Sequence, residues 1–597
     1  MVDPERLRAA YCKARDALLA ERTPVGHWIG ELSSSALSTA TAVTALAIVA
    51  RSAGVNSTHE RLIDAGLSWL ADHQNADGGW GDTVKSISNI STTMLCRAAF
   101  HVTDRAAQFS DVVHRYETWL FERYGRTPQE LVEAVRQRYG KDRTFSVPIL
   151  MMCALAGLVP WKEVPRLPFE MACLPQSWYR FARMPVVSYA LPALIAIGQV
   201  IHFHRSTWNP ITWILRKLGR RRSLRVLERI QPSSGGYLEA TPLTSFVVMS
   251  LAAMWAAGRY AASGVIAKGV EFIVKSARAD GSWPIDTNLS IWVTTLSVNA
   301  LAAAGDLDSL DRRDELLAWL LKQQLKEVHP YTGAAPGAWG WSDEPGSVPD
   351  CDDTPGAVLA VHNLAPDPNR NPASQANIEA QRWVVDLQNR DGGFPTFCRG
   401  WGQLPFDRSG CDLTAHAARA VEGMIGDFRP WQGRGLPAAF AYLARQQRSD
   451  GSWLPLWFGN QHAPDDINPV YGTTKVLAAY RDLNRIDSDV ARRGIAFLLD
   501  VQNTDGGWGG AKDTPSSVEE TALAVEILVD LAPADRQAAV ERGIEYLIRR
   551  VEDGTFRDPS PIGFYFAKLW YFEKLYPIIF TVAALGRALR THASEDR

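Results

Sequence analysis

The chain alternates between apolar stretches with a helical repeat and short polar turns. In residues 36–50 and 294–304 the sequence is rich in Ala and Leu, and the apolar positions recur with the 3.6-residue period of a helix. The sustained alternation of apolar and polar positions that is typical of strands does not occur in the sequence. The pattern therefore predicts an all-α fold.

One turn sequence recurs between the predicted helices. Residues 74–80 read QNADGGW, residues 388–394 read QNRDGGF, and residues 502–508 read QNTDGGW. Related copies lie at 279–283 and 447–453, and looser ones at 235–237 and 553–556. The copies nearest the C-terminus are spaced by about one helical hairpin, which is what a stacked array of helix pairs requires.

The chemistry of this turn predicts its structural role. An Asp-Gly dipeptide favours a turn, and its glycine readily adopts the positive φ with which a helix commonly ends. The preceding Gln ends a helix and can hydrogen-bond to backbone groups of the loop. The following aromatic residue offers a large face with which to stack on the Gln and hold the next helix. We therefore expect these turns to have a structural role and no catalytic one.

The composition indicates two large cores and an excess of aromatic residues. The chain has 597 residues, of which 46% are hydrophobic, with 63 basic and 65 acidic residues. This charge balance gives no indication of nucleic-acid binding. The seven cysteines contain no Cys-x-x-Cys pair, which argues against a disulfide framework or structural zinc and suggests a reducing compartment. The 21 Trp, 21 Phe and 16 Tyr exceed what a core requires.

Two apolar stretches approach the length of a membrane span. Residues 145–161 and 185–201 fall a little short of about 18 apolar residues, and each contains a proline. We expect them to be buried or interfacial. Charged residues from Asp3 onward interrupt the N-terminus before an apolar run forms, so no signal peptide is predicted.

An acidic motif is the strongest candidate for chemistry. Residues 350–354 read DCDDT, after a Gly- and Pro-rich loop and before an apolar segment. Three carboxylates within four positions raise one another's pKa values, so at least one proton is retained at neutral pH. A carboxylic acid in an apolar cavity can protonate an alkene. Taken by itself, such a cluster also fits a helix N-cap or a divalent-cation site.

Together, the turns and the acidic motif resemble the squalene–hopene and oxidosqualene cyclase family, with its QW repeats and Asp-x-Asp-Asp-Thr acid. The resemblance covers nearly the whole chain. It implies two α/α-barrels: an inserted N-terminal barrel at residues 22–290 and a catalytic barrel at 291–597, against which the first helix, 1–21, packs. It also implies a class II terpene cyclase that needs no metal or other cofactor.

The same resemblance assigns roles in the acid. Asp352 corresponds to the proton donor, and Asp350 and Asp353 correspond to its network partners. His416 matches the family histidine that hydrogen-bonds to the acid, and Tyr471 matches a tyrosine of the surrounding shell. Cys351 and the Pro-Gly pair after Thr354 depart from the family pattern.

Aromatic faces stabilise carbocations in a dry pocket, at about 1–2 kcal/mol each, which gives the aromatic excess a function. The resemblance places Trp292 at the far end of the cavity, Trp341 near a second-ring cation and Phe397 beside the first cations. It matches Trp457 to a tryptophan that holds the substrate, and it matches Tyr565 and Phe572 to aromatic residues of the cavity. Phe181 stands where hopene-forming members of the family have a tryptophan. For any single one of these residues core packing is the better explanation, and the set as a whole is more convincing than its parts.

Residues 201–225 combine tryptophans at 208 and 213 with a basic run from Arg216 to Arg222, a mixture typical of interfacial docking. A solvated basic loop is the alternative. The resemblance implies peripheral, monotopic attachment at the cytoplasmic face of a bacterial membrane, a squalene-like polyprene substrate, a hopanoid-like product and a possible homodimer.

Three other functions remain open. One is a class II cyclase acting on a prenyl diphosphate or a prenylated aromatic, although no Lys/Arg cluster that would bind a diphosphate is evident along the sequence. Another is a zinc-dependent prenyltransferase-like subunit, in which Cys351, Asp352 and His416 imitate a metal site. The third is a non-catalytic α/α-barrel binding module, which the acidic run disfavours.

Overall fold

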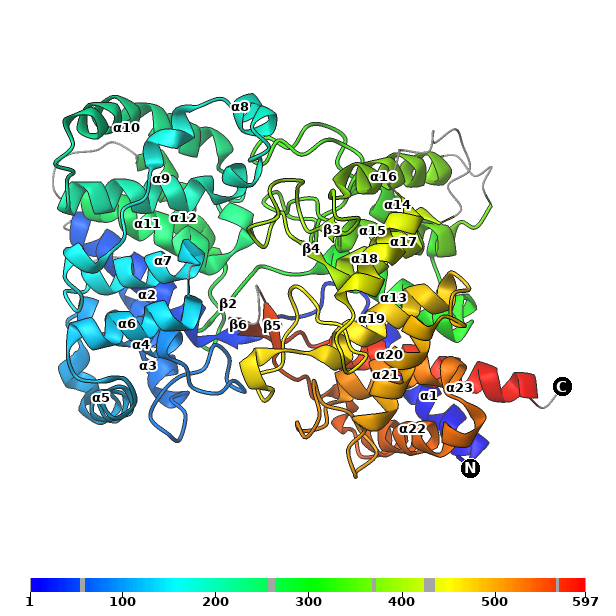
Figure 1. Cartoon of the computed structure of the whole chain (residues 1–597). Coiled ribbons are helices and arrows are strands. Elements are labelled where there is room, and N and C mark those ends of the chain that lie inside the picture. The colour runs from blue at the N-terminus through cyan, green and yellow to red at the C-terminus, as the bar shows by residue number, and fades with distance from the viewer. Residues whose placement is uncertain are drawn as a thin grey trace.

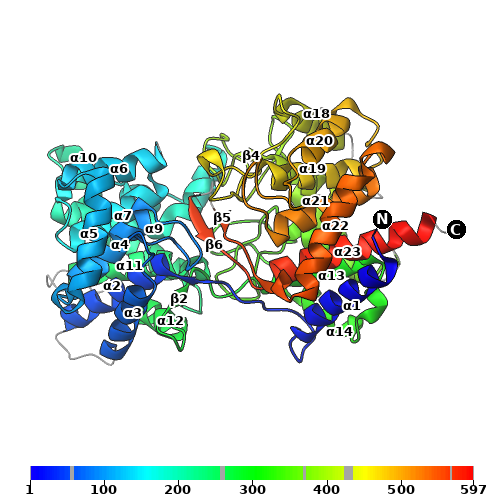
Figure 2. The ribbon, with the colours of Figure 1, turned by 90° about the horizontal axis from the view of Figure 1, so that it is seen from below.

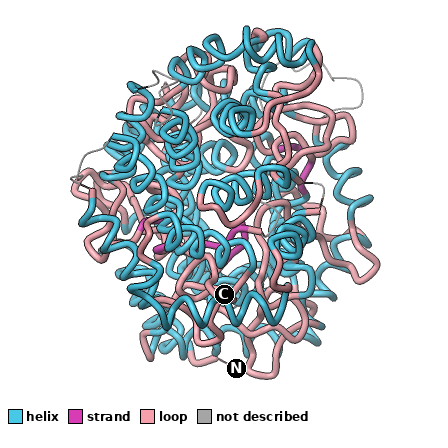
Figure 3. Tube along the Cα trace, turned by 90° about the vertical axis from the view of Figure 1, so that its left-hand side faces the viewer, coloured by secondary structure: helices cyan, strands magenta, loops and turns pink. Residues whose placement is uncertain are grey.

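The computed structural model describes residues 2–53, 59–140, 142–255, 263–367, 372–422, 435–564 and 568–595. Helices form most of this structure, and loops connect them (Figure 3). They group into two domains that lie side by side (Figures 1 and 2). The all-α prediction is confirmed.

The first domain contains helices from the N-terminal half of the chain. Their bounds are α2 (Ala36–Ala53), α3 (Glu60–Asp72), α4 (Ile90–Val102), α5 (Ser110–Tyr124), α6 (Pro128–Tyr139), α7 (Arg143–Leu155), α8 (Gln176–Phe181), α9 (Val186–His204), α10 (Pro210–Ile230), α11 (Thr241–Trp255) and α12 (Ser263–Lys275). Helices α2, α4, α7, α9 and α11 pack in turn, and α11 packs against α2 to close the ring. Both apolar stretches noted in the sequence, in α7 and α9, therefore lie in this inner ring.

The second domain contains the later helices together with the first one. Their bounds are α13 (Ser290–Ala304), α14 (Arg313–Lys322), α15 (Asp353–Leu364), α16 (Ala373–Leu387), α17 (Cys411–Val421), α18 (Leu436–Gln446), α19 (Pro469–Asp482), α20 (Asp489–Asp500), α21 (Val518–Leu531), α22 (Gln537–Glu552), α23 (Tyr576–Glu595) and α1 (Pro4–Ala20). The odd-numbered helices from α13 to α23 form a closed ring, and the even-numbered helices pack outside it. Helix α1 packs on α22 and α23, so the N-terminus belongs to this barrel.

The remaining elements are short. The 3-10 helices are η1 (Ala106–Phe109), η2 (Trp161–Glu163), η3 (Phe169–Cys173), η4 (Tyr237–Glu239), η5 (Leu307–Ser309), η6 (Pro464–Asp466), η7 (Ala534–Arg536) and η8 (Thr555–Arg557). The strands form antiparallel pairs: β1 (Ser34–Ser35) with β2 (Trp283–Pro284), β3 (Phe394–Pro395) with β4 (Ser409–Gly410), and β5 (Ile562–Phe564) with β6 (Leu569–Tyr571).

The repeated turns join successive helix pairs by hydrogen bonds. In the copy at 502–508, Gln502 Nε2 donates to the carbonyl oxygens of Gly506 (2.8 Å) and Ala539 (2.8 Å), and so links its own turn to the start of α22. The indole of Trp508 donates to Leu498 O at 2.7 Å, ten residues earlier in α20. The copies that begin at Gln74 and Gln447 make the same pairs of bonds. The expected role of the Gln is confirmed.

The segment around β6 ties the two domains together. Trp570 N donates to Asp82 Oδ2 at 2.8 Å, and Ser33 N donates to Phe572 O at 2.8 Å. Asp82 is buried in the first domain, where Thr92 and Asn89 also donate to it. A C-terminal segment of the second domain is thereby anchored on the first, and β5 and β6 lie between the domains (Figure 2).

The indole hydrogen bond of the repeated turn predicts a measurable loss of stability. Trp508→Phe keeps an aromatic ring but leaves the buried Leu498 carbonyl without its donor, which costs about 1–3 kcal/mol. We expect a lower thermal midpoint by scanning calorimetry. Trp208→Phe, at a position 97% exposed, is the matched control and leaves the midpoint unchanged. Equal midpoints for the two variants would contradict a structural role for this bond.

Candidate active site

The acidic motif lies where a loop enters α15, at the centre of the second barrel. Asp350 Oδ1 accepts hydrogen bonds from the backbone N–H groups of Asp352 (2.7 Å) and Asp353 (2.8 Å), and so forms the first turn of the helix. Asp350 and Asp353 are buried, whereas the Asp352 side chain is 21% exposed. Two carboxyls are thus enclosed behind a third that faces a pocket.

His416 of α17 holds the carboxyl that faces the pocket. Its Nδ1 lies 3.2 Å from Asp352 Oδ1. Burial lowers the pKa of His416, and the hydrogen bond to Asp352 opposes that shift only in part, so the imidazole stays neutral near pH 7. A neutral imidazole that donates its Nδ1 proton can hydrogen-bond to the carboxylate that Asp352 becomes after it gives up its proton.

The cluster as a whole retains protons. Burial raises the pKa of Asp350 to about 6, and burial followed by the charges of Asp350 and Asp352 raises the pKa of Asp353 well above its usual value. Asp412, on α17 four residues before His416, has a pKa of about 7 because of burial and the charge of Asp352. At neutral pH these carboxyls cannot all be ionised. The expectation of a retained proton therefore holds for this structure.

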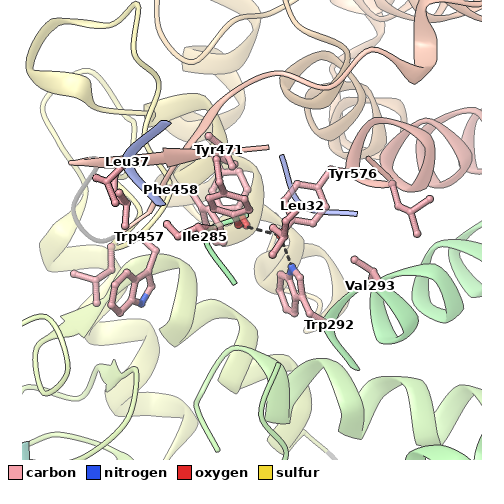
Figure 4. Packing of buried hydrophobic residues seen from close by; sticks show 14 of the residues in the cluster. Leu32, Leu37, Ile285, Trp292, Val293, Trp457, Phe458, Tyr471 and Tyr576 are labelled. Atoms are coloured by element: carbon pink, nitrogen blue, oxygen red, sulfur yellow. Dashed lines mark hydrogen bonds between the residues drawn. The ribbon is translucent and has the colours of Figure 1, made fainter. Parts of the chain in front are cut away.

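Several residues singled out in the sequence meet at one pocket. Trp292, Asp352, His416 and Tyr471 line a cavity of about 310 Å³ together with Asp412. Tyr471 is 4% exposed, and its ring lies 4.7 Å from that of Phe458 (Figure 4). Residues from α13, α15, α17 and α19 therefore converge, because alternate helices form the inner ring.

Trp292 lies beside the acid, which corrects its expected place at the far end of the cavity. Its ring centroid is 6.4 Å from that of His416, and its indole donates to Tyr576 OH at 2.9 Å (Figure 4). The physical reason is the helix order: Trp292 is in the first turn of α13, and α13 packs directly against α15, which begins at the acid. Tyr576 and Tyr571, whose hydroxyls lie 2.9 Å apart, complete this wall.

A second aromatic group lies on the other side of the acid motif. The Phe397 ring is 6.3 Å from that of Trp457 and 5.0 Å from that of Tyr189 in the first domain. Trp457 Nε1 donates to Thr396 Oγ1 at 2.8 Å, and Cys351 N donates to Thr396 O at 2.7 Å. This group is therefore coupled to the backbone of the acid. Trp341 and Phe406 pack on the same small cluster, with Val348 and Cys398.

The remaining predicted aromatics do not join these groups. Phe181 is 93% exposed on α8, which corrects its assignment to the cavity: a ring in water cannot shelter a carbocation. Phe572 is half-buried, with Lys85 Nζ 5.3 Å from its ring, and its role stays a prediction. Tyr565 lies outside the described residues.

Asp412 and Lys475 were not predicted as site residues, although their spacing from His416 and Tyr471 indicates them. Asp412 and His416 are four positions apart, so both face the acid from one side of α17. Lys475, four residues after Tyr471, is half-buried and lines the same pocket, with its Nζ 5.0 Å from the Tyr471 ring. Burial lowers the pKa of Lys475. No spacing argument indicates Tyr189, because this residue belongs to the other domain.

The described residues contain no group of three or more His, Cys, Asp or Glu side chains arranged to hold a metal ion. Cys351 is fully buried, and its neighbouring carboxyls and burial raise its thiol pKa well above the usual value, which disfavours the thiolate that zinc binds. The geometry thus gives no support to the zinc-dependent alternative.

Comparisons with known proteins agree with this geometry. Residues 289–590 match the squalene-hopene cyclase C-terminal domain, and residues 12–114 match the N-terminal domain. A probable squalene–hopene cyclase of Sinorhizobium fredii (strain NBRC 101917 / NGR234) is 23% identical, over 97% of this chain and 96% of the relative. Drimenyl diphosphate synthase of Streptomyces showdoensis is 32% identical over 40% of this chain and 42% of the relative.

A solved structure shows the same fold over the whole chain. The ent-copalyl diphosphate synthase from Streptomyces platensis superposes with a TM-score of 0.58 at 17% identity, covering 98% of this chain and 99% of that one. The two-barrel architecture expected from the sequence is confirmed at the level of the fold.

The carboxyl cluster predicts a titration visible by infrared spectroscopy. Asp412, with a pKa of about 7, contributes a protonated-carboxyl C=O band that disappears as the pH rises through 7, and Asp412→Asn removes that component. Asp450→Asn is the control: burial alone would raise its pKa, but hydrogen bonds from Ser452 lower it, so Asp450 is already ionised. An unchanged band in the Asp412 variant would show that this carboxyl is ionised at neutral pH.

Proposed function

The chain belongs to the squalene–hopene cyclase family of class II terpene cyclases, and from this premise we propose that Asp352 protonates the terminal alkene of a linear polyprene to start its cyclisation. One observation carries the proposal: a cluster of buried carboxyls that retains protons presents one member, hydrogen-bonded to His416, to a pocket that Trp292 and Tyr471 line together with charged side chains. The protein is an enzyme, and squalene is the first substrate to test.

The first step transfers a proton from the Asp352 carboxyl to the terminal carbon of the alkene. The π electrons form the new C–H bond and leave a tertiary carbocation, while Asp352 becomes a carboxylate that His416 stabilises. Neighbouring double bonds then attack the cation in turn, each forming a ring bond and moving the charge along the chain. The barrier falls because the folded substrate is held in a reactive geometry before protonation.

Aromatic side chains near the acid stabilise the charge as it moves. Trp292 and Tyr471 lie beside the acid, and Phe397 and Trp457 lie next to its backbone. Faces of such rings attract a cation when water is absent, at about 2 kcal/mol for a desolvated contact. They are also non-nucleophilic as carbon faces, so they stabilise the cation without trapping it. A squalene-like chain would give a polycyclic, hopanoid-like product by this route.

An exposed apolar surface on the first domain supports membrane docking. Trp208 is 97% exposed, Ile211 69% and Leu218 73%, all on α10 or directly before it. Trp178 and Phe181 of α8 are also exposed, and α8 and α10 lie along the same edge of the first domain (Figure 1). Lys217, Arg221 and Arg222 provide the positive charge that binds anionic lipids.

Two observations refine the predicted docking segment. Arg216 turns inward, where its guanidinium pairs with Glu170 at 3.1 Å, so it does not belong to the basic face. Helix α9 is the one described helix long and apolar enough to cross a membrane, but about two thirds of its most apolar stretch is buried within the domain. We therefore propose peripheral attachment at the cytoplasmic face of the membrane. The homodimer stays a prediction.

Replacing the proposed acid tests the function. We expect detergent-purified wild-type protein, without added metal, to convert squalene, farnesyl diphosphate or geranylgeranyl diphosphate to a cyclic product detected by mass spectrometry. Asp352→Asn cannot donate a carboxylic proton and loses roughly a thousandfold or more in rate. Asp500→Asn, on the exposed end of α20, keeps wild-type activity. Cyclic product from Asp352→Asn at the wild-type rate would overturn the assignment.

The docking surface predicts vesicle binding. The double variant Trp208→Ser, Leu218→Ser removes two exposed apolar side chains, so its partitioning onto vesicles of anionic lipid should fall about tenfold or more. Co-sedimentation measures the bound fraction, and Ile486→Ser, in the second domain, is the control. Equal binding of all three proteins would contradict docking through α10.

A further inference from the structure

A large chamber opens where the two domains meet, and its walls carry an excess of positive charge. It has a volume of about 1380 Å³. Arg180 and Arg183 of the first domain face it across from Lys326, Arg382, Arg390 and Arg399 of the second. Three acidic residues, Glu379, Asp386 and Asp391, also line it. The chain as a whole has a net charge of −2, so this concentration of cations is local.

Part of the positive charge of the chamber has no ion-pair partner. Among the described residues, Arg183, Arg382 and Arg390 form no ion pair. Asp391 is occupied by its own turn, where its Oδ1 accepts from Gly393 N (3.0 Å) and Ser409 Oγ (2.9 Å). An unpaired cluster of guanidinium groups on the walls of a cavity is suited to phosphate groups, which arginine binds through two parallel hydrogen bonds.

The inner wall of the chamber is the aromatic group next to the acid. Tyr189, Phe397 and Cys398 line the chamber, and the Phe397 ring contacts Trp457 at a centroid distance of 6.3 Å. Trp457 is joined through Thr396 to the backbone of Cys351, between Asp350 and Asp352. A chain of contacts thus links the cationic chamber at the domain junction, through aromatic rings and Thr396, to the backbone of the acid motif.

We propose that this chamber binds the diphosphate head of a prenyl diphosphate while the prenyl chain extends past Phe397 toward Asp352. The inference rests on the proposed cyclase function and names its substrate class. A pure hydrocarbon such as squalene gains nothing from six cationic side chains, whereas an anionic head gains both attraction and orientation. The head group is bound and not cleaved, because the reaction begins at the opposite end of the chain. The product therefore keeps its diphosphate.

This site is not visible in the linear sequence, because its cations are scattered along the chain. Arg180 and Arg183 belong to the α8–α9 region, Lys326 follows α14, and the others come from α16 and the loops after it. No two of these segments are adjacent in sequence. The linear sequence contains no Lys/Arg cluster, and the cations of the proposed site come together only through the fold of both domains.

A kinetic comparison of matched substrates tests the head-group site. The double variant Arg382→Gln, Arg390→Gln should raise KM for geranylgeranyl diphosphate or farnesyl diphosphate about ten- to a hundredfold, because each lost charge-assisted bond weakens binding. Conversion of the corresponding alcohol should not change, and inorganic pyrophosphate should compete with the diphosphate but not with the alcohol. Arg61→Gln, an exposed arginine on α3, is the control.

Binding measurements separate this inference from the cyclase proposal. Asp352→Asn, although inactive, should bind inorganic pyrophosphate by calorimetry as well as the wild type does, and the double arginine variant should bind it at least tenfold more weakly. If no substrate is cyclised but this difference in binding persists, the cyclase proposal fails and the anion site stands. Equal pyrophosphate binding by the wild type and the double variant overturns the head-group site.

The chamber lies near α8, so an anionic lipid head is the other possible source of phosphate. Vesicles of phosphatidylglycerol and of phosphatidylcholine distinguish the two. We expect the double variant to bind both kinds of vesicle as the wild type does. Loss of binding to phosphatidylglycerol vesicles alone, with an unchanged KM for prenyl diphosphates, would overturn the proposal in favour of a lipid-binding site.

Discussion

A carboxyl group keeps its proton at neutral pH only where ionisation is costly, and the acid of this protein depends on that condition. Asp350 and Asp353 are enclosed behind Asp352, so their burial and mutual repulsion keep part of the cluster protonated. Asp352 faces the pocket, where His416 can stabilise the carboxylate left by proton transfer. Asp352 thus faces the pocket, while Asp350 and Asp353 are buried.

This arrangement requires the closed ring of the second barrel. The acid begins α15, His416 and Asp412 come from α17, Tyr471 from α19, and Trp292 from α13. Each of these helices packs against the next, and the hydrogen-bonded turns hold the outer helices against them. Small errors in the position of one inner helix would separate the acid from its partners. The structural repeats therefore contribute to catalysis indirectly, by fixing distances.

The sequence predicted what depends on local patterns. The turns, the helices and the acidic motif each depend on residues that are close together in the chain, so they could be predicted from the sequence. The position of Trp292 was not, because it depends on which helices become neighbours. The prediction that Phe181 lines the cavity was wrong for the same reason. Its local sequence resembles that of a cavity residue, but in the fold α8 exposes its side chain to solvent. The position of Asp412 was predictable from the sequence, because its four-residue spacing from His416 places both residues on one face of α17.

The domain junction explains why a single barrel is insufficient for the proposed substrate. The acid and most of the aromatic residues belong to the second domain, but Tyr189, Arg180 and Arg183 come from the first. A prenyl diphosphate has two ends with opposite requirements: its head needs charge and tolerates water, whereas its reacting alkene needs a dry cavity. A site shared by two domains can meet both, because the charged residues line the open junction while the acid remains inside the ring. Holding the head in place also limits which alkene can reach Asp352, so the arginines would determine orientation as well as affinity.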